Sequence, residues 1–250
     1  MSAGGNRPPV VKYRTWFDAT GRTPRQMLFQ ARHSMSPLVN PAALFKLRLP
    51  CRRRERLWPP AAWDLDDACR LPSFAEVAGV PDVLDLTMAW NPAGVAIRSV
   101  AHGVGSSRWC HTTRPEDSDG LQLWIATRPT GESHRAGRYC RRIALLPTGG
   151  GRLADKPAAV AAVIPRTSEV PAELPTGSVE LESALLADGW RIDAFISAAA
   201  LPGWDPAELP RLGFFAALVD RRLGKVPCFA PPEFPWDGDP TTWAELELVG

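Results

Sequence analysis

The chain has 250 residues, of which 45% are hydrophobic and 22% charged, and its formal net charge is +2. These values are ordinary for a folded soluble domain and exclude full-length disorder, a collagen-like repeat and a coiled coil. The 26 prolines and 20 glycines disfavour a helical bundle, and no apolar run approaches the ~20 residues that a membrane helix requires.

Residues 1–41 predict a basic, partly extended lead-in. Prolines and Gly21 interrupt this segment, and only residues 23–32 have the composition of a short helix. The segment lacks the apolar core of a signal peptide, which predicts a cytoplasmic protein. The main domain is expected to cover residues 42–250.

Positive charge is concentrated at the front of the chain. Residues 1–58 hold 12 Lys or Arg against 2 Asp or Glu, whereas residues 59–250 hold 17 against 25. Such a region attracts an acidic partner. Nucleic acid is not the expected partner, because the basic residues are scattered except at Arg52–Arg54 and Arg56 and accompany no nucleic-acid motif.

The five cysteines are odd in number, form no Cys-x-x-Cys pair and are predicted to be free thiols.

From residue 83 onward, β-rich runs alternate with turn residues. Val83–Trp90 and Val95–Val100 flank Asn91–Gly94 and predict a hairpin with a four-residue turn. Apolar residues alternate in Trp190–Ile196, which predicts a strand with one buried face. Further strands are expected at residues 121–125, 142–146, 158–164, 178–186, 212–220 and 246–249, and a helical turn at 197–201.

Many strands with few helices indicate an all-β fold, a two-sheet antiparallel β-sandwich of jelly-roll type with short helical turns. A βαβ arrangement is the alternative, and it is disfavoured because the segments between strands lack amphipathic runs of helix length. Trp90 and Trp190 lie within apolar strands and are expected in the core, whereas Trp109 lies in a loop.

Acidic, aromatic and basic residues gather around residues 114–128. Leu121, Leu123 and Ile125 are expected on one face of this strand, with Gln122 and Trp124 on the other. Such a mixture is typical of saccharide recognition, since an indole packs on the C–H face of a pyranose while Arg, Gln and carboxylate groups bond its hydroxyls. The candidate ligand-binding residues are Trp109, Arg114, Asp119, Gln122, Trp124, Arg128, His134 and Arg135.

The sequence lacks the local signatures of common enzymes. It has no Gly-x-Ser-x-Gly elbow and no His-Glu-x-x-His pair, and Gly149–Gly151 is a turn rather than a phosphate loop. The four histidines are too scattered to predict zinc binding. Asp117 and Asp119 lie in a hydrophilic turn, where solvation opposes the raised pKa that a glycosidase acid needs. Their oxygen atoms suit a hard cation such as calcium instead.

Several motifs, taken in order, resemble carbohydrate-binding module family 9 and its DOMON-like relatives. They are Ala89–Val95, Asp119–Ile125, Leu201–Pro206, Leu212–Phe214 and Asp239–Leu248, so the resemblance covers roughly residues 42–250. Cys51–Arg54 before a Trp and Ser133–Ala136 before an Arg/Tyr/Cys segment are similar to stand-alone bacterial members of planctomycete type. The resemblance implies an antiparallel β-sandwich without catalytic residues that holds a sugar between tryptophans, with calcium as a further ligand of the family.

Two functions stay open on this basis. The first is a non-catalytic module that binds carbohydrate by Trp stacking and by hydrogen bonds from Arg, Gln and Asp. The second is an interaction or scaffold protein that has lost sugar binding and docks an acidic partner through its basic N-terminal region. The second is motivated by the missing export signal and by Ala126, at a position where many relatives place Asp.

Overall fold

The computed structural model describes residues 46–63, 65–105, 108–128, 133–167 and 173–250. The predicted lead-in, its short helix at 23–32 and the domain boundary at residue 42 lie outside the described residues. Among the helices of the described part, none has the length and apolar character to cross a membrane.

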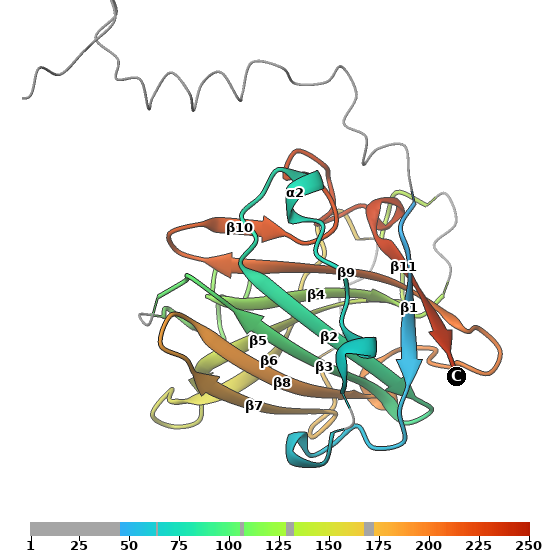
Figure 1. Ribbon diagram of the computed structural model, residues 1–250, viewed down its shortest axis with the longest axis horizontal. Coiled ribbons are helices and arrows are strands. Elements are labelled where there is room, and N and C mark those ends of the chain that lie inside the picture. The colour runs from blue at the N-terminus through green and yellow to red at the C-terminus, as the bar shows by residue number, and fades with distance from the viewer. Residues whose placement is uncertain (1–45, 64, 106–107, 129–132, 168–172) are drawn as a thin grey trace, which may run out of the picture. The chain divides into compact units, whose positions relative to one another are not determined.

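Strands dominate the described part of the chain (Figure 1), which confirms the predicted all-β class. Its helical elements are short: α2 (Ala75–Ala78) and the 3-10 turns η2 (Pro60–Ala62), η3 (Asp67–Cys69), η4 (Ala198–Ala200) and η5 (Pro240–Thr242). Its strands are β1 (Arg48–Arg53), β2 (Leu84–Asn91), β3 (Gly94–Ala101), β4 (Gly120–Ala126), β5 (Cys140–Gly150), β6 (Lys156–Ala162), β7 (Val179–Leu185), β8 (Trp190–Ser197), β9 (Arg211–Asp220), β10 (Gly224–Pro227) and β11 (Ala244–Val249).

All these strands belong to one hydrogen-bonded sheet with the order β6-β5-β4-β9-β11-β1-β2-β3-β8-β7, and β10 pairs with β9. The sheet is nearly closed: Ser183 Oγ of β7, at one end, donates a hydrogen bond of 2.7 Å to the Pro147 carbonyl of β5, near the other. The predicted antiparallel pairing is wrong for β1, which runs parallel to both β11 and β2. The remaining strand pairs are antiparallel. The division into two packed sheets stays a prediction.

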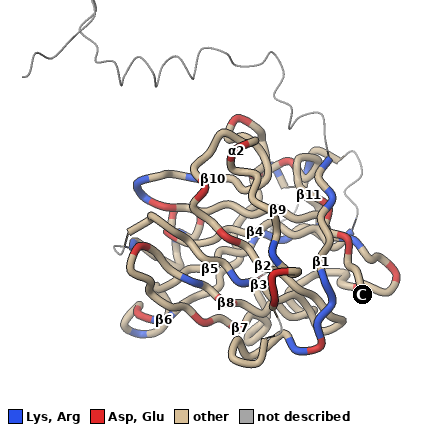
Figure 2. Tube along the Cα trace, in the orientation of Figure 1, with Lys and Arg blue, Asp and Glu red and all other residues tan. Residues whose placement is uncertain are grey.

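Strands β1 and β10 are not predicted by the sequence. β1 contains Pro50 and several arginines, which weaken its strand signal; its basic positions are visible in Figure 2. It is held in place because Leu49 and Cys51 are buried in the core, whereas the other four residues of the strand are exposed. β10 has only four residues and pairs only with β9, so its sequence is too short to show the alternation that predicts a strand.

The predicted hairpin is formed by β2 and β3, with a tighter turn than expected. Asn91 pairs with Gly94, which leaves only Pro92 and Ala93 in the turn. The Asn91 Oδ1 atom accepts a hydrogen bond of 2.9 Å from the Ala93 N–H and stabilises this two-residue connection. The helical turn predicted at 197–201 is confirmed as η4.

The core confirms most of the expected burial. Trp90 and Trp190 are 8% and 2% exposed, and the apolar face predicted for β8 is buried. The five cysteines are free thiols, as predicted. Strand β4, in contrast, is buried along its whole length on both faces, so Gln122 and Trp124 are enclosed rather than presented to solvent.

We predict that Gly189→Ala lowers the free energy of unfolding by about 1–3 kcal/mol, or more if the backbone cannot adjust. A Cβ at Gly189, in the turn between β7 and β8, would lie 1.8 Å from the Ala101 carbonyl oxygen of β3. Gly137→Ala is the matched control, because a Cβ there meets no atom within 4 Å. Urea denaturation of both variants measures the difference, and equal midpoints would contradict the predicted contact.

Candidate functional site

Residues 109–119 form a loop directly before β4, and hydrogen bonds between Trp109 and Asp119 join its two ends. The Trp109 N–H donates to Asp119 Oδ2 (2.6 Å), and the Trp109 carbonyl accepts from the Asp119 N–H (2.9 Å). Within the loop, Ser118 Oγ accepts from the His111 N–H (2.8 Å) and donates to the Arg114 carbonyl (2.8 Å). These bonds replace regular secondary structure and give the loop a defined shape.

Asp119 also fixes a second segment against this loop. Its Oδ1 atom accepts a hydrogen bond of 2.9 Å from the Arg221 N–H, in the turn between β9 and β10. The solvation predicted for Asp119 is wrong, because the residue is only 3% exposed. Burial raises the pKa of Asp119, although the N–H groups of Trp109 and Arg221 oppose that rise. Both carboxylate oxygens are therefore occupied by backbone donors, and Asp119 positions the site instead of facing a ligand.

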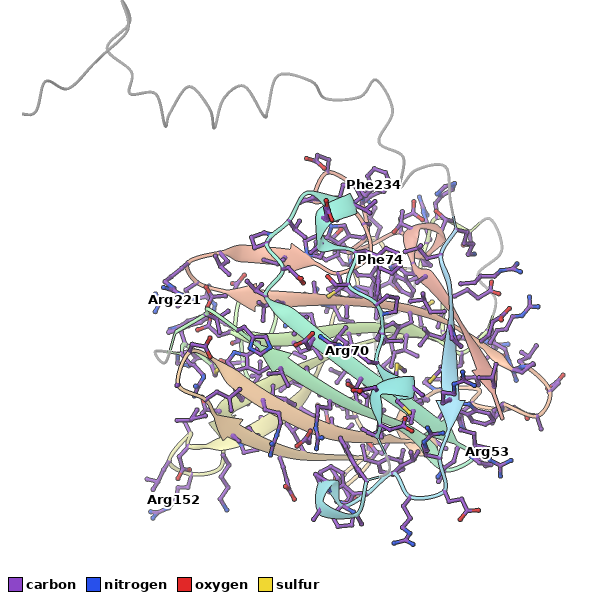
Figure 3. The ribbon with its side chains drawn as sticks, viewed as in Figure 1. Arg53, Arg70, Phe74, Arg152, Arg221 and Phe234 are labelled. Atoms are coloured by element: carbon purple, nitrogen blue, oxygen red, sulfur yellow. The ribbon has the colours of Figure 1, made fainter. Side chains whose placement is uncertain are left out.

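Three polar side chains lie against the indole of Trp109, which is partly exposed, and two of them place a guanidinium group over its ring. The ring centroid of His111 lies 4.4 Å from that of Trp109, and the guanidinium carbons of Arg114 and Arg221 lie 5.1 Å and 5.6 Å from it. His111, Arg114 and Arg221 are all exposed, and Figure 3 shows Arg221 at the edge of the molecule. We call Trp109, His111, Arg114 and Arg221 the Trp109 cluster.

Gln122 and Trp124 form part of a separate, buried group around Arg142. Gln122 Nε2 donates to the Pro115 carbonyl (2.6 Å), and its Oε1 accepts from Arg142 Nε (3.1 Å). The Arg142 guanidinium lies 4.7 Å from the Trp124 ring, and burial lowers the pKa of Arg142. Trp124 Nε1 donates to the Asp237 carbonyl (3.0 Å). The polar atoms of this group are matched to one another, so the two predicted ligand residues have structural partners here.

The other three predicted residues lie elsewhere. The guanidinium carbon of Arg128 lies 5.6 Å from the centroid of the Tyr139 ring, and Arg128 Nη2 lies 3.9 Å from Glu208 Oε2. Arg135 is exposed, and its carbonyl accepts a hydrogen bond from Ser133 Oγ. His134 Nδ1 lies 2.7 Å from Asp239 Oδ2. Burial alone would raise the pKa of Asp239, but hydrogen bonds from Thr241 and His134 outweigh it and lower the pKa. No hydrogen bond, ion pair or ring contact among described residues joins Arg128, His134 or Arg135 to the Trp109 cluster.

Sequence reasoning missed Arg221 and a second aromatic group. Arg221 follows a predicted strand, but nothing in the sequence pairs it with a loop about a hundred positions earlier. Trp58 and Trp63, both partly exposed, lie edge to face with 5.9 Å between ring centroids. The Arg98 guanidinium carbon lies 5.1 Å from the Trp63 ring. The two tryptophans, close together after an arginine run, were a signal that this second group existed.

Asp117 and Asp119, whose oxygen atoms were considered as ligands for calcium, have other partners in the structure. Asp117 forms an ion pair of 2.8 Å with Arg114, and both oxygens of Asp119 accept backbone hydrogen bonds. Across the described ranges, no group of three or more His, Cys, Asp or Glu side chains is arranged to hold a metal ion.

Comparison with solved structures identifies the fold. A carbohydrate-binding module family 9 protein from Caldicellulosiruptor kristjanssonii in complex with cellotriose superimposes with a TM-score of 0.55 at 12% identity, covering 81% of this chain and 94% of the other. The same type of module in complex with glucose gives 0.53 at 11% identity, over 81% and 96%. A putative carbohydrate-binding protein from Bacteroides uniformis ATCC 8492 gives 0.53 at 11%, over 81% and 98%. No protein-family model and no curated protein sequence matches this chain. The chain has the fold of family 9 carbohydrate-binding modules.

Proposed function

We propose that this protein is a non-catalytic carbohydrate-binding protein that holds a saccharide against Trp109. The observation that carries the proposal is the Trp109 cluster, a partly exposed indole with three exposed polar side chains around it. The fold supports it, since the similar modules were solved with cellotriose and glucose.

The chemistry of the cluster suits a pyranose. The apolar indole provides a surface for the C–H face of the ring, while the guanidinium groups of Arg114 and Arg221 and the imidazole of His111 donate hydrogen bonds to hydroxyls. The loop and the turn that carry them are fixed by Asp119, so little conformational entropy is lost when a ligand binds.

A hydrolytic role is disfavoured by the state of the two candidate carboxylates. Glycoside hydrolysis needs a pair of carboxyl groups that face the scissile bond. Asp119 is buried with both oxygens bonded to the backbone, and Asp117 is paired with Arg114. Neither carboxylate is free to act as acid, base or nucleophile in this arrangement.

We predict that Trp109→Ala weakens binding of cellotriose or glucose by at least about tenfold, because the stacking surface is lost. Isothermal titration calorimetry measures the affinity. Trp58→Ala is the matched control, since Trp58 is a partly exposed tryptophan of the other aromatic group. Loss of binding in Trp58→Ala but not in Trp109→Ala would show that the saccharide binds at Trp58 and Trp63 instead. If the wild-type protein bound no saccharide, the proposed function would be refuted.

The alternative, an acidic partner docked through residues 1–58, is supported by one observation. Arg52, Arg53 and Arg56 are exposed on or beside β1, and none forms an ion pair with another described residue. A solution of poly-glutamate separates the two functions. Salt-sensitive binding of this polymer that Arg52→Gln together with Arg53→Gln abolishes, in a protein that binds no saccharide, would favour the alternative.

A further inference from the structure

Among the charged groups of the Trp109 cluster, the Arg221 guanidinium forms no ion pair with a described carboxylate, although its charge opposes the rise in the pKa of the buried Asp119. The exposed carboxylate of Asp117 is paired with Arg114 at 2.8 Å. Asp119 is buried and bonded to backbone N–H groups. Asp220 is also buried, and its Oδ1 accepts from the N–H groups of Arg222 and Leu223. Arg221 is therefore an exposed arginine that forms no ion pair with a described carboxylate, beside a second guanidinium on the same ring.

The backbone of Arg221 is held on both sides. Its own N–H is bonded to Asp119, and the next residue, Arg222, donates from Nη2 to the Gly103 carbonyl (2.7 Å). The side chain therefore starts from a fixed position next to Trp109. A ligand anion that meets it does not need to order the turn first, which favours a defined geometry of contact.

A guanidinium presents N–H donors in a planar fork that matches a carboxylate, and such charge-assisted bonds are about twice as strong as neutral ones. A neutral sugar hydroxyl accepts only single hydrogen bonds from the same group. Arg114 is already paired with Asp117, so Arg221 is the guanidinium of the cluster that is available to a ligand carboxylate.

We infer that the saccharide held by the Trp109 cluster is an acidic one, with its pyranose ring against Trp109 and its carboxylate bonded to Arg221. The inference rests on the proposed function and specifies the class of ligand. A uronic acid unit has the required chemistry, since it combines an apolar C–H face with a carboxylate on the same ring.

The test compares two ligands that differ only at C6. Methyl β-D-glucuronoside carries a carboxylate where methyl β-D-glucoside carries a neutral hydroxymethyl group. With the full chain at low salt, calorimetry is expected to show about tenfold tighter binding of the glucuronoside. The preference is expected to shrink toward twofold at about 0.5 M NaCl, because salt screens an exposed ion pair.

Arg221→Gln is expected to abolish the preference, because it weakens binding of the glucuronoside about tenfold more than binding of the glucoside. Arg53→Gln, which removes the same charge from β1, is the control and is expected to keep it; Figure 3 shows Arg53 and Arg221 on opposite sides of the view. Equal affinity for both glycosides, a preference that survives Arg221→Gln, or equally tight binding of inorganic sulfate would each overturn the inference and leave the proposed function standing. Absence of binding by either glycoside, cellotriose and glucose would refute both.

Discussion

Trp124→Ala is expected to lower the free energy of unfolding by about 3–5 kcal/mol, as the loss of a fully buried tryptophan generally does. Trp124 is 1% exposed, and its ring lies 5.4 Å from that of Trp236 and 6.0 Å from that of Phe215. Its removal leaves a cavity and deprives the Arg142 guanidinium of the ring against which it lies. Urea denaturation measures the loss.

Two further variants decide whether Trp124 has a structural or a ligand role. Trp124→Phe keeps much of the ring but loses the N–H that bonds to the Asp237 carbonyl, so about 1–2 kcal/mol of stability is expected to be lost. Trp109→Ala, at a partly exposed position, is expected to cost less than about 1 kcal/mol. If Trp124→Phe kept wild-type stability but lost saccharide affinity, Trp124 would be a ligand residue after all.

The strands were predictable because their signal is local. Runs such as those of β2, β3 and β8 are rich in residues that favour strands and are bounded on one side by turn residues, namely Asn91, Gly94 and Gly189. These features need no knowledge of distant segments. β1 was not predictable, because its strand conformation depends on parallel pairing with β11, at the far end of the sequence. The same dependence explains why the single continuous sheet was not anticipated.

The candidate site was predictable only where it is local. Trp109 and Arg114 lie within one short loop, so their composition suggested that they act together. Gln122 and Trp124 were assigned to solvent because β4 looks two-faced, and this expectation missed the segment that covers its second face, including Trp236. The turn with Arg221 is held next to Trp109 by the Asp119 side chain, which accepts hydrogen bonds from the backbone N–H groups of both residues. A contact of this kind produces no periodic pattern in the sequence from which it could be predicted.

Asp119→Ala is expected to lower the free energy of unfolding by about 2–4 kcal/mol, because it leaves two partly buried backbone donors without their acceptors. Those donors are the N–H groups of Trp109 and Arg221, so the variant also separates the two segments of the Trp109 cluster. Saccharide affinity is expected to fall even though Asp119 itself does not face the ligand. Urea denaturation and calorimetry on the same preparation measure the two effects.

The stability loss in Asp119→Ala is expected to depend on pH. Burial raises the pKa of Asp119 in the folded protein above its value in the unfolded chain, so the contribution of Asp119 is largest in acid. The difference in stability between the wild type and Asp119→Ala should therefore narrow as the pH rises above about 3.8, the ordinary pKa of an aspartate. Asp117→Ala is the control two residues away, and the loss of its exposed ion pair should cost at most about 1 kcal/mol. Equal effects of the two substitutions would show that Asp119 does not fasten the loop to the turn, and the Trp109 cluster would then lack the anchor on which its geometry depends.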